Sequence, residues 1–183
     1  VSQDVGTFPG LNAAELGIKG LELEGSAMVG KATTITGQLS WLDAQYDRFD
    51  DFRLDPGYPG FDLNVSHDHV PFSPKVTARV GVQHGFDLAN GSRLAIGGDI
   101  SYRGTTWLSV DNRDVLKQDY YSVVGVYGVW DSPQYKWQVR AGIRNLTDES
   151  YMVEGQEFAS VGNIQTAYYG LPRNMYLSVR YNF

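Results

Sequence analysis

Apolar and polar residues alternate one by one along several stretches of this 183-residue chain, and the last stretch shows the pattern most clearly. The alternate positions from residue 174 onward are Met175, Leu177, Val179, Tyr181 and Phe183. A period of two residues is typical of a β-strand with one apolar and one polar face. Because chain ends tend to fray in water, a strand that runs to a final Phe183 is expected to have apolar surroundings, as a closed barrel in lipid provides.

Six earlier stretches also have the composition or the alternation of strands. These strands are expected at residues 14–27, 33–46, 75–86, 92–103, 120–130 and 136–144. In the first of them, Leu16 and Ile18 are out of phase with Leu21. This change of phase predicts a β-bulge near residues 19–20.

Short and long connections alternate strictly between the expected strands. The short turns lie near residues 29–31, 88–91 and 131–135, and the long connections span residues 47–73, 104–118 and 145–173. Asn90-Gly91 is the strongest of the turn signals. Outer-membrane barrels have short periplasmic turns and long extracellular loops. The pattern therefore predicts an all-β fold, an antiparallel transmembrane β-barrel segment of about seven strands.

The charged residues of the strands fall on the face opposite to the apolar one. Those expected to point into the barrel are Arg79, Arg93, Asp99, Arg103, Arg140, Arg144 and Arg180. A charge on the lipid face costs about 2–4 kcal/mol at mid-depth, so this separation favours a membrane barrel. Arg79 and Asp99 are expected to form a pair across two adjacent antiparallel strands.

Aromatic residues gather at both ends of the expected strands. Those beside the short turns are Phe86, Trp130, Trp137, Tyr181 and Phe183, and those at the long-loop ends are Trp41, Tyr46, Tyr102, Tyr120 and Tyr176. Two aromatic bands separated by about nine residues of tilted strand match the girdles of a membrane barrel.

Seven strands would bring the first and the last strand together in parallel, whereas bacterial single-chain barrels have antiparallel seams. Gly6, Pro9 and Gly10 argue against an eighth strand at residues 1–12. Bare strand edges are not tolerated in lipid. Both outer strands are therefore expected to pair with strands absent from this sequence, which predicts an open, curved sheet.

Composition excludes several classes of function. The net charge of −6 and the pI near 4.9 argue against a nucleic-acid partner. The absence of Cys excludes disulfides and thiolate metal sites. No apolar run reaches the length of a membrane helix, about 18 residues. No catalytic constellation stands out, so the chain is not expected to be an enzyme.

The C-terminal end carries a set of motifs. They are Asn145-Leu146-Thr147-Asp148 followed by Tyr151, then Tyr169-Gly170-Leu171-Pro172-Arg173, and finally Val179-Arg180-Tyr181-Asn182-Phe183. Together with residues 20–24 and 74–75, they resemble the C-terminus of TonB-dependent outer-membrane receptors. On this resemblance, residues 1–183 are the C-terminal part of such a receptor's barrel, without its plug domain and TonB box.

The resemblance implies a plugged 22-stranded barrel of the bacterial outer membrane. Such receptors import a scarce nutrient, most often a ferric siderophore or similar chelate, with energy relayed by TonB. The implied partners are outer-membrane lipid, the plug and remaining barrel strands, TonB through the plug, and the barrel-assembly machinery. That machinery would read Tyr181 and Phe183 as an assembly signal. No resident cofactor or metal is expected.

Ligand contacts are expected in the long loops and the lumen. The candidate residues are Phe52, Tyr58, Phe61, Trp107, Tyr168, Arg103 and Arg144. In the alternative interpretation, the aromatic residues only stabilise the loops, and the arginines pair with Asp99, Glu22, Glu24 or a plug. His67-Asp68-His69 has donors that suit a metal ion, although two histidines in a loop are more often solvated.

A structural role is expected for the motif Asn145–Asp148. Its Asn and Asp side chains are expected to bond nearby backbone groups and fix the exit of a strand from the sheet.

The alternative function is a small standalone outer-membrane barrel that acts on lipids or has a structural or adhesive role. A lipid enzyme would need a catalytic Ser or His near a barrel rim, and none is convincing in the sequence.

Overall fold

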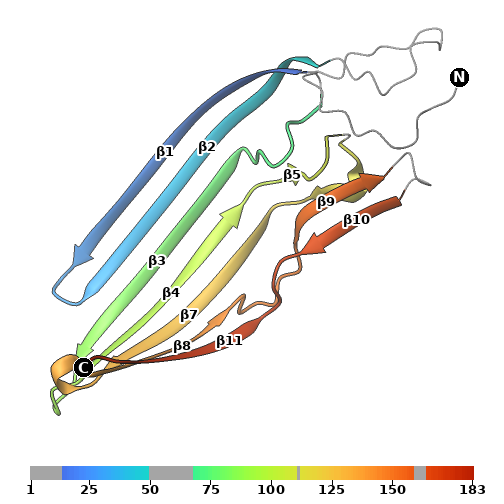
Figure 1. Cartoon of the computed structure of the whole chain (residues 1–183). Helices are drawn as coiled ribbons and strands as arrows, with labels where there is room; N and C mark the ends of the chain where they lie inside the picture. The colour runs from blue at the N-terminus through green and yellow to red at the C-terminus, as the bar shows by residue number, and fades with distance from the viewer. Residues whose placement is uncertain (1–13, 50–67, 111, 159–163) are drawn as a thin grey trace, which may run out of the picture.

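The computed structural model describes residues 14–49, 68–110, 112–158 and 164–183, most of which belong to one curved antiparallel sheet (Figure 1). The seven strands of this sheet, in spatial order, are β1 (Ala14–Val29), β2 (Thr33–Phe49), β3 (Val76–Asp87), β4 (Arg93–Arg103), β7 (Tyr121–Asp131), β8 (Trp137–Arg144) and β11 (Asn174–Tyr181). All seven predicted strands are present. The predicted antiparallel, all-β fold is confirmed.

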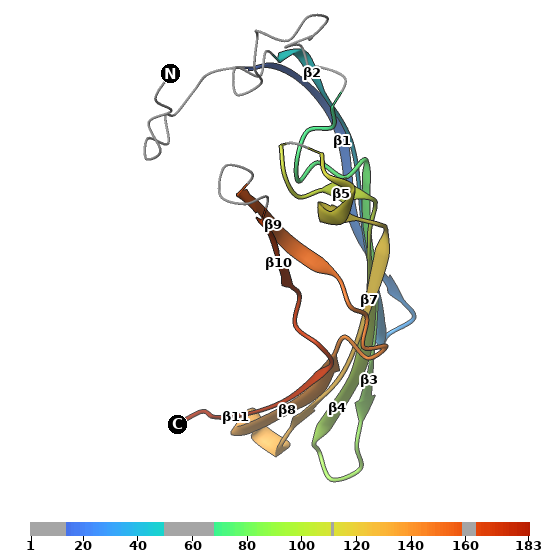
Figure 2. The same ribbon diagram turned by 90° about the vertical axis from the view of Figure 1, so that its right-hand side faces the viewer.

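The sheet is open. Figure 2 shows it curving around a concave face, with β1 and β11 at its two edges. Within the described residues these two edge strands do not pair with each other, as a small closed barrel would require. The predicted open, curved sheet is therefore correct, and both edges retain the backbone groups that a further strand would bond.

Tight turns join the strands at one end of the sheet. Gly30 and Gly91 have φ of 66° and 81°, a region that glycine enters without the strain of a side chain. In the β3–β4 turn, the amide of Gly91 bonds the carbonyl of Leu88, and the amide and hydroxyl of Ser92 bond Oδ1 of Asn90. The Asn-Gly signal thus marked a real hairpin.

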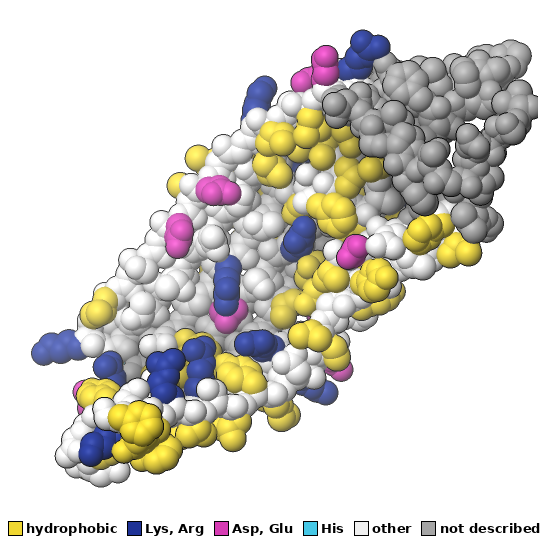
Figure 3. Space-filling view, in the orientation of Figure 1, with side chains coloured by type: hydrophobic (Ala, Val, Ile, Leu, Met, Phe, Trp, Pro, Cys, Tyr) yellow, Lys and Arg dark blue, Asp and Glu magenta, His cyan; other side chains and the backbone are white. Residues whose placement is uncertain are grey.

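Cross-strand register sorts the side chains into two faces. Val80 lies opposite Ile100, which lies opposite Val124. On this convex face the apolar side chains stay open, with Val80 53% and Ile100 47% exposed. A continuous apolar surface of this kind is typical of strands that face lipid. Arginine and acidic side chains lie on the concave face, which Figure 3 shows from the same direction as Figure 1.

The β-bulge of β1 is not where the sequence predicted it. The register shifts between Glu15 and Leu16, and pairing from Leu16 to Val29 is regular, so the bulge expected near residues 19–20 is wrong. Leu16 and Ile18 therefore share the concave face with Tyr46 and Ala44, their partners on β2. The reason is length: β1 and β2 have 16 and 17 residues, whereas about 9–11 suffice to cross a bilayer. Beyond the lipid, apolar residues need not face outward.

The two aromatic bands are confirmed in part. At the short-turn end, ring centroids of Trp137 and Tyr181 lie 4.6 Å apart, and those of Tyr181 and Phe183 lie 5.0 Å apart. At the other end, Tyr102 and Tyr120 are 6.2 Å apart. The assignment of Tyr46 and Tyr176 to the outer band is wrong, since the register places Tyr46 opposite Leu16 and Tyr176 opposite Gly142 on the concave face.

Two of the long connections contain short elements that the sequence did not predict. The connection from β4 to β7 holds β5 (Thr106–Trp107), the 3₁₀ helix η1 (Asp114–Leu116) and β6 (Lys117–Gln118). The connection from β8 to β11 holds the hairpin β9 (Met152–Phe158) and β10 (Ile164–Tyr169), which leans over the concave side (Figure 2). A second 3₁₀ helix, η2 (Pro133–Tyr135), forms the β7–β8 turn.

The hairpin and the β4–β7 connection share a small core at the long-loop end. Leu108 and Leu116 are 2% and 1% exposed. A Cβ added at Gly155 would lie 2.9 Å from Cβ of Leu108, so a glycine allows β9 to approach this closely. Across the described ranges, no helix has both the length and the apolar character needed to cross a membrane.

Candidate functional site

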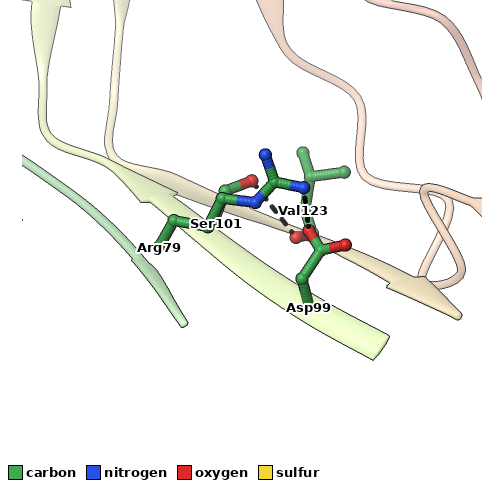
Figure 4. Close-up of polar contacts among 4 residues, drawn as sticks. All are labelled: Arg79, Asp99, Ser101 and Val123. Atoms are coloured by element: carbon green, nitrogen blue, oxygen red, sulfur yellow. Dashed lines mark hydrogen bonds and ion pairs between the residues drawn. The ribbon is translucent and has the colours of Figure 1, made fainter. Parts of the chain in front are cut away.

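Arg79 and Asp99 form an ion pair in the middle of the concave face. Nη2 of Arg79 lies 3.0 Å from Oδ2 of Asp99 (Figure 4). Arg79 is directly opposite Ser101 and Asp99 is opposite Gly81, so the pair is diagonal across β3 and β4. Gly125 flanks Asp99 on β7, and the two glycines leave room for the carboxylate. This confirms both the predicted pair and the predicted inward face.

Two tyrosines lie flat across glycines of the neighbouring strand. The ring of Tyr127 covers Gly97 on β4, and its hydroxyl donates to Oε1 of Gln83 at 2.9 Å. A Cβ added at Gly97 would lie 2.6 Å from Cζ of Tyr127. Tyr176 on β11 covers Gly142 on β8 in the same way, with an added Cβ 2.6 Å from its hydroxyl. Because each glycine has no side chain, the tyrosine ring can lie flat along the barrel wall.

Two arginines of β8 rest on these rings. Cζ of Arg140 lies 4.7 Å from the ring centroid of Tyr127, and Cζ of Arg144 lies 4.9 Å from that of Tyr176. Nε of Arg140 also donates weakly to the hydroxyl of Tyr176 at 3.4 Å. A guanidinium above a ring face is attracted by the ring quadrupole. The rings therefore hold both cations against the lumen wall.

These side chains surround hollows on the concave face. One hollow of about 990 Å³ is lined by Arg79, Asp99, Arg140, Arg144, Tyr127 and Tyr176 among others. A second, of about 440 Å³ toward the long-loop end, is lined by Arg79, Arg103, Tyr121 and Tyr151 among others. The rings of Tyr121 and Tyr151 stack at 4.3 Å. Both hollows combine cations with aromatic rings.

Asn145 ties the hairpin to the end of β8. The side chain is 2% exposed, and its Nδ2 donates to the carbonyl of Glu149 and to that of Leu171. Its Oδ1 accepts from the amide of Glu149. Asp148 Oδ1 accepts from the amide of Arg173. The prediction that Asn145 and Asp148 fix the strand exit through backbone bonds is confirmed.

Backbone geometry explains why Asn and Asp occur at residues 145 and 148. Asn145 and Asp148 have φ of 51° and 58°, and Asn and Asp are among the few side chains that enter this region readily. Tyr151, three residues further on, stacks on Tyr121 of β7. The amide of Gly170 bonds the carbonyl of Tyr151, and any side chain at residue 170 would overlap the ring of Tyr151. Both ends of the hairpin are thus fastened to the barrel wall.

Trp107 takes part in contacts between loops. Its ring stacks on His69 at 3.7 Å and lies 5.4 Å from Nζ of Lys117. The amide of His69 bonds Oδ1 of Asn112, whose Nδ2 bonds the carbonyl of His69. His69 is exposed, which agrees with the expectation that it is solvated, and it also takes part in these loop contacts. Stacking of the His69 ring on Trp107 joins the segment around His69 to the β4–β7 connection.

The structure brings only part of the predicted ligand set together. Arg103 and Arg144 lie on the concave face, in the smaller and the larger hollow respectively. Trp107 and the exposed Tyr168 of β10 line neither of these two hollows. Phe52, Tyr58, Phe61 and His67 fall outside the described residues. Among the residues that are described, no group of three or more His, Asp and Glu could hold a metal ion.

Sequence reasoning missed Tyr127 and Gln83, and it misplaced Tyr176. The signal was present, because Tyr127 and Tyr176 each share the polar parity of their strand. Each also faces a glycine on the next strand, Gly97 or Gly142. Only the register between strands reveals these partners, and the register depends on turn and bulge geometry.

An open antiparallel sheet, apolar on its convex face and charged on its concave face, defines one wall of a transmembrane β-barrel. The family model for the TonB dependent receptor-like β-barrel matches residues 1–146. The chain belongs to this family, whose barrels lie in the bacterial outer membrane and serve transport receptors rather than enzymes. The family model covers residues 1–146, and the C-terminal motifs lie in residues 145–183, so together they cover the whole chain.

Solved structures show the same fold. The chain is similar to the ferric yersiniabactin uptake receptor FyuA from Yersinia pestis, with 20% identity over 94% of this chain and a TM-score of 0.72. It is also similar to the siderophore receptor PiuA (18%, 93% and 0.68) and the ferric preacinetobactin receptor BauA (20%, 92% and 0.65), both from Acinetobacter baumannii. It spans 24%, 22% and 22% of these three chains. A comparison with curated proteins gave no match.

Proposed function

We propose that residues 1–183 form the C-terminal wall of the barrel of a TonB-dependent receptor, which imports a ferric siderophore or a similar chelate. The observation that carries the proposal is the family match over residues 1–146. The names of the similar solved structures, which are receptors for siderophores, support the class of cargo. The chain acts as a transport receptor and not as an enzyme. Its C-terminal aromatic residues Tyr181 and Phe183 serve barrel assembly.

Within this function, cations and aromatic rings of the long-loop end bind the cargo. Arg103 and Arg144 attract an anionic chelate, since a cleft lined by one sign of charge raises the local concentration of its counter-ion. Stacked Tyr121 and Tyr151 offer ring surface next to Arg103. Trp107, Tyr168, Phe52, Tyr58 and Phe61 complete the contact set from the loops. A plug domain outside this sequence closes the lumen and couples to TonB.

A growth assay under iron limitation tests the proposed function. The gene for the full-length receptor is deleted, and the cells are grown under iron limitation with single ferric siderophores supplied one at a time. We expect loss of growth with at least one siderophore and recovery when the gene is returned. Unchanged growth with every chelate, together with unchanged uptake of radioactive iron, would contradict the proposal.

A charge variant tests the proposed cargo site. Arg103→Gln should weaken binding of the identified chelate several-fold, because it removes a cation from the smaller hollow. Arg93→Gln is the matched control, since Arg93 lies beside the β3–β4 turn, 3.9 Å from Asp87, at the other end of the sheet. Equal binding by both variants would exclude Arg103 from the site.

A further inference from the structure

A groove crosses the convex side of the sheet, on the face opposite to Arg79 and Asp99. Its volume is about 780 Å³, within the range of sites for small organic molecules, about 300–1,000 Å³. The convex-face residues that line it are Leu94, Ile96, Val126, Gly128, Ala141, Ile143, Met175 and Leu177. None of these residues has a polar side chain, so the groove suits hydrocarbon.

The floor of the groove is a pair of small residues on adjacent strands. Gly128 on β7 lies directly opposite Ala141 on β8. The same cross-strand row continues to Ile96 on β4 and to Leu177 on β11, whose larger side chains border the floor. Among the described residues, the nearest atom beyond its chain neighbours to a Cβ added at Gly128 is the carbonyl oxygen of Ala95, at 3.9 Å. The space above Gly128 is therefore open.

The floor of the groove stays uncovered when further strands complete the barrel. β7 and β8 each have both of their neighbours in this sheet, and a further strand would join β11 in the plane of the sheet. The groove is therefore continuous with the convex surface around it, which faces lipid in a barrel of this family. What fills it in the membrane is either a lipid chain or the lipid-facing surface of another protein.

The groove follows the direction of a lipid chain. It begins at Leu94, the second residue of β4, beside the short turns, and it ends at Met175, the second residue of β11, toward the long loops. Between these ends it passes over β7 and β8. Strands of membrane barrels are tilted by about 35–45°, so a line along the membrane normal crosses from strand to strand in this oblique way (Figure 1). A chain perpendicular to the membrane surface can thus lie along the groove.

The end of the groove at Leu94 lies at the depth of lipid headgroups. Leu94 is directly opposite Trp130 on β7, and the rings of Trp137 and Tyr181 lie 4.6 Å apart at the same end of the sheet. Trp and Tyr gather where the hydrocarbon meets the headgroups. Lys136, which precedes Trp137, is exposed and brings a cation to this end. Because the short turns of such barrels are periplasmic, this end belongs to the periplasmic leaflet.

We propose that the groove holds one acyl chain of a glycerophospholipid of the periplasmic leaflet, with the lipid phosphate at the level of Lys136 and Trp137. A flexible chain adapts to the floor at Gly128 and Ala141, whereas an unfilled gap forfeits the dispersion contacts of the atoms that line it. A second copy of the protein would need a rigid ridge that matches the groove along its length. The site does not depend on which cargo the receptor imports.

A photoreactive phospholipid tests the site in the full-length receptor. The receptor is reconstituted in vesicles of phosphatidylethanolamine that include molecules with a diazirine near the end of one acyl chain. Light converts the diazirine into a carbene with loss of dinitrogen, and the carbene inserts into a nearby bond of the protein. We expect several-fold more label on the segments around Gly128 and Ala141 than around Val80, which lies on the convex face outside the groove. Equal labelling would overturn the proposal, because lipid would then contact the groove no more closely than the rest of the face.

A variant with a filled groove gives the second test. Gly128→Leu places a branched side chain above the floor. Gly37→Leu is the matched control, since Gly37 is a convex-face glycine opposite Val80 with open space around an added Cβ. Gly128→Leu should reduce the labelling around Ala141 several-fold, and Gly37→Leu should leave it unchanged. Heat-modifiable gel migration shows that both barrels are folded.

Native mass spectrometry of the receptor in mild detergent separates the possible occupants. The unsubstituted receptor and Gly37→Leu should retain a phospholipid that Gly128→Leu has lost. A dimer that Gly128→Leu abolishes would assign the groove to a second copy, and a retained lipopolysaccharide would place the headgroup in the other leaflet. Either result would overturn the proposal, as would the same lipid content in all three forms.

Discussion

The side-chain amide of Asn145 donates to the carbonyl oxygen of Leu171 at 3.1 Å, across 26 positions of the chain. This bond joins the two ends of the segment that contains β9 and β10, because Asn145 directly follows β8 and Leu171 lies shortly before β11. The hairpin is therefore fastened where it leaves the wall. The middle of β9, at Gly155, packs on the small core of Leu108 and Leu116.

Asn145→Ala should loosen the hairpin. The change removes three hydrogen bonds at a buried position and leaves the carbonyls of Glu149 and Leu171 without their donor. Each hydrogen bond of this kind contributes about 0.5–1.5 kcal/mol to stability. Hydrogen exchange of residues 149–171 should become faster. Asn174→Ala, which removes one bond to the carbonyl of Pro172, is the control and should have little effect.

Gly142→Ala should destabilise the β8–β11 wall. The new methyl group would lie 2.6 Å from the Tyr176 hydroxyl oxygen, so the ring must leave the wall. Overpacking of this kind typically costs about 1–3 kcal/mol. Gly37→Ala is the matched control, since nothing lies within 4 Å of the added carbon. Urea unfolding of the barrel in detergent should separate the two variants, and equal midpoints would show that Tyr176 moves freely.

The Arg79–Asp99 pair should contribute little to stability. The two side chains are 59% and 25% exposed, and partly exposed ion pairs contribute below about 1 kcal/mol. A double-mutant cycle with Arg79→Gln and Asp99→Asn should give a small coupling energy that falls further at high salt. A coupling of several kcal/mol would mean that the lumen shields the pair from water.

Phe183→Ala should reduce insertion of the receptor in cells without reducing the stability of inserted barrels. Phe183 is fully exposed, and its ring lies 5.0 Å from that of Tyr181. Surface labelling compares its level with that of Tyr135→Ala, which removes another exposed aromatic side chain near the short turns. Normal surface levels of Phe183→Ala would exclude a role as assembly signal.

Much of the wall could be predicted from the sequence because the constraint is local. In a strand that crosses lipid, every second residue must be apolar. Val80, Ile100 and Val124 therefore indicate both the strands to which they belong and the outer face of each strand. The inward positions of Arg79 and Asp99 follow from the same parity. The Asn145–Asp148 motif was also readable, because Asn and Asp have few alternatives at positive φ.

The prediction failed where the lipid constraint ends. Leu16, Ile18 and Tyr46 belong to β1 and β2, which have 16 and 17 residues where about 9–11 suffice to cross a bilayer, so an apolar residue near their long-loop ends can face either side. The hairpin β9–β10 and its core at Leu108 and Leu116 depend on contacts between loops far apart in sequence. Periodicity carries no information about such contacts.

The sequence by itself determined the strands, their turns and the face that each strand offers to lipid, since these follow from a two-residue period and from residues at the turns. The tertiary structure decided which residues meet across strands. The contacts of Tyr127 with Gly97, of Tyr176 with Gly142 and of Arg140 with the Tyr127 ring depend on the register of β4, β7, β8 and β11. A shift of one residue would turn every one of these side chains to the other face, so only the paired sheet fixes the lumen wall.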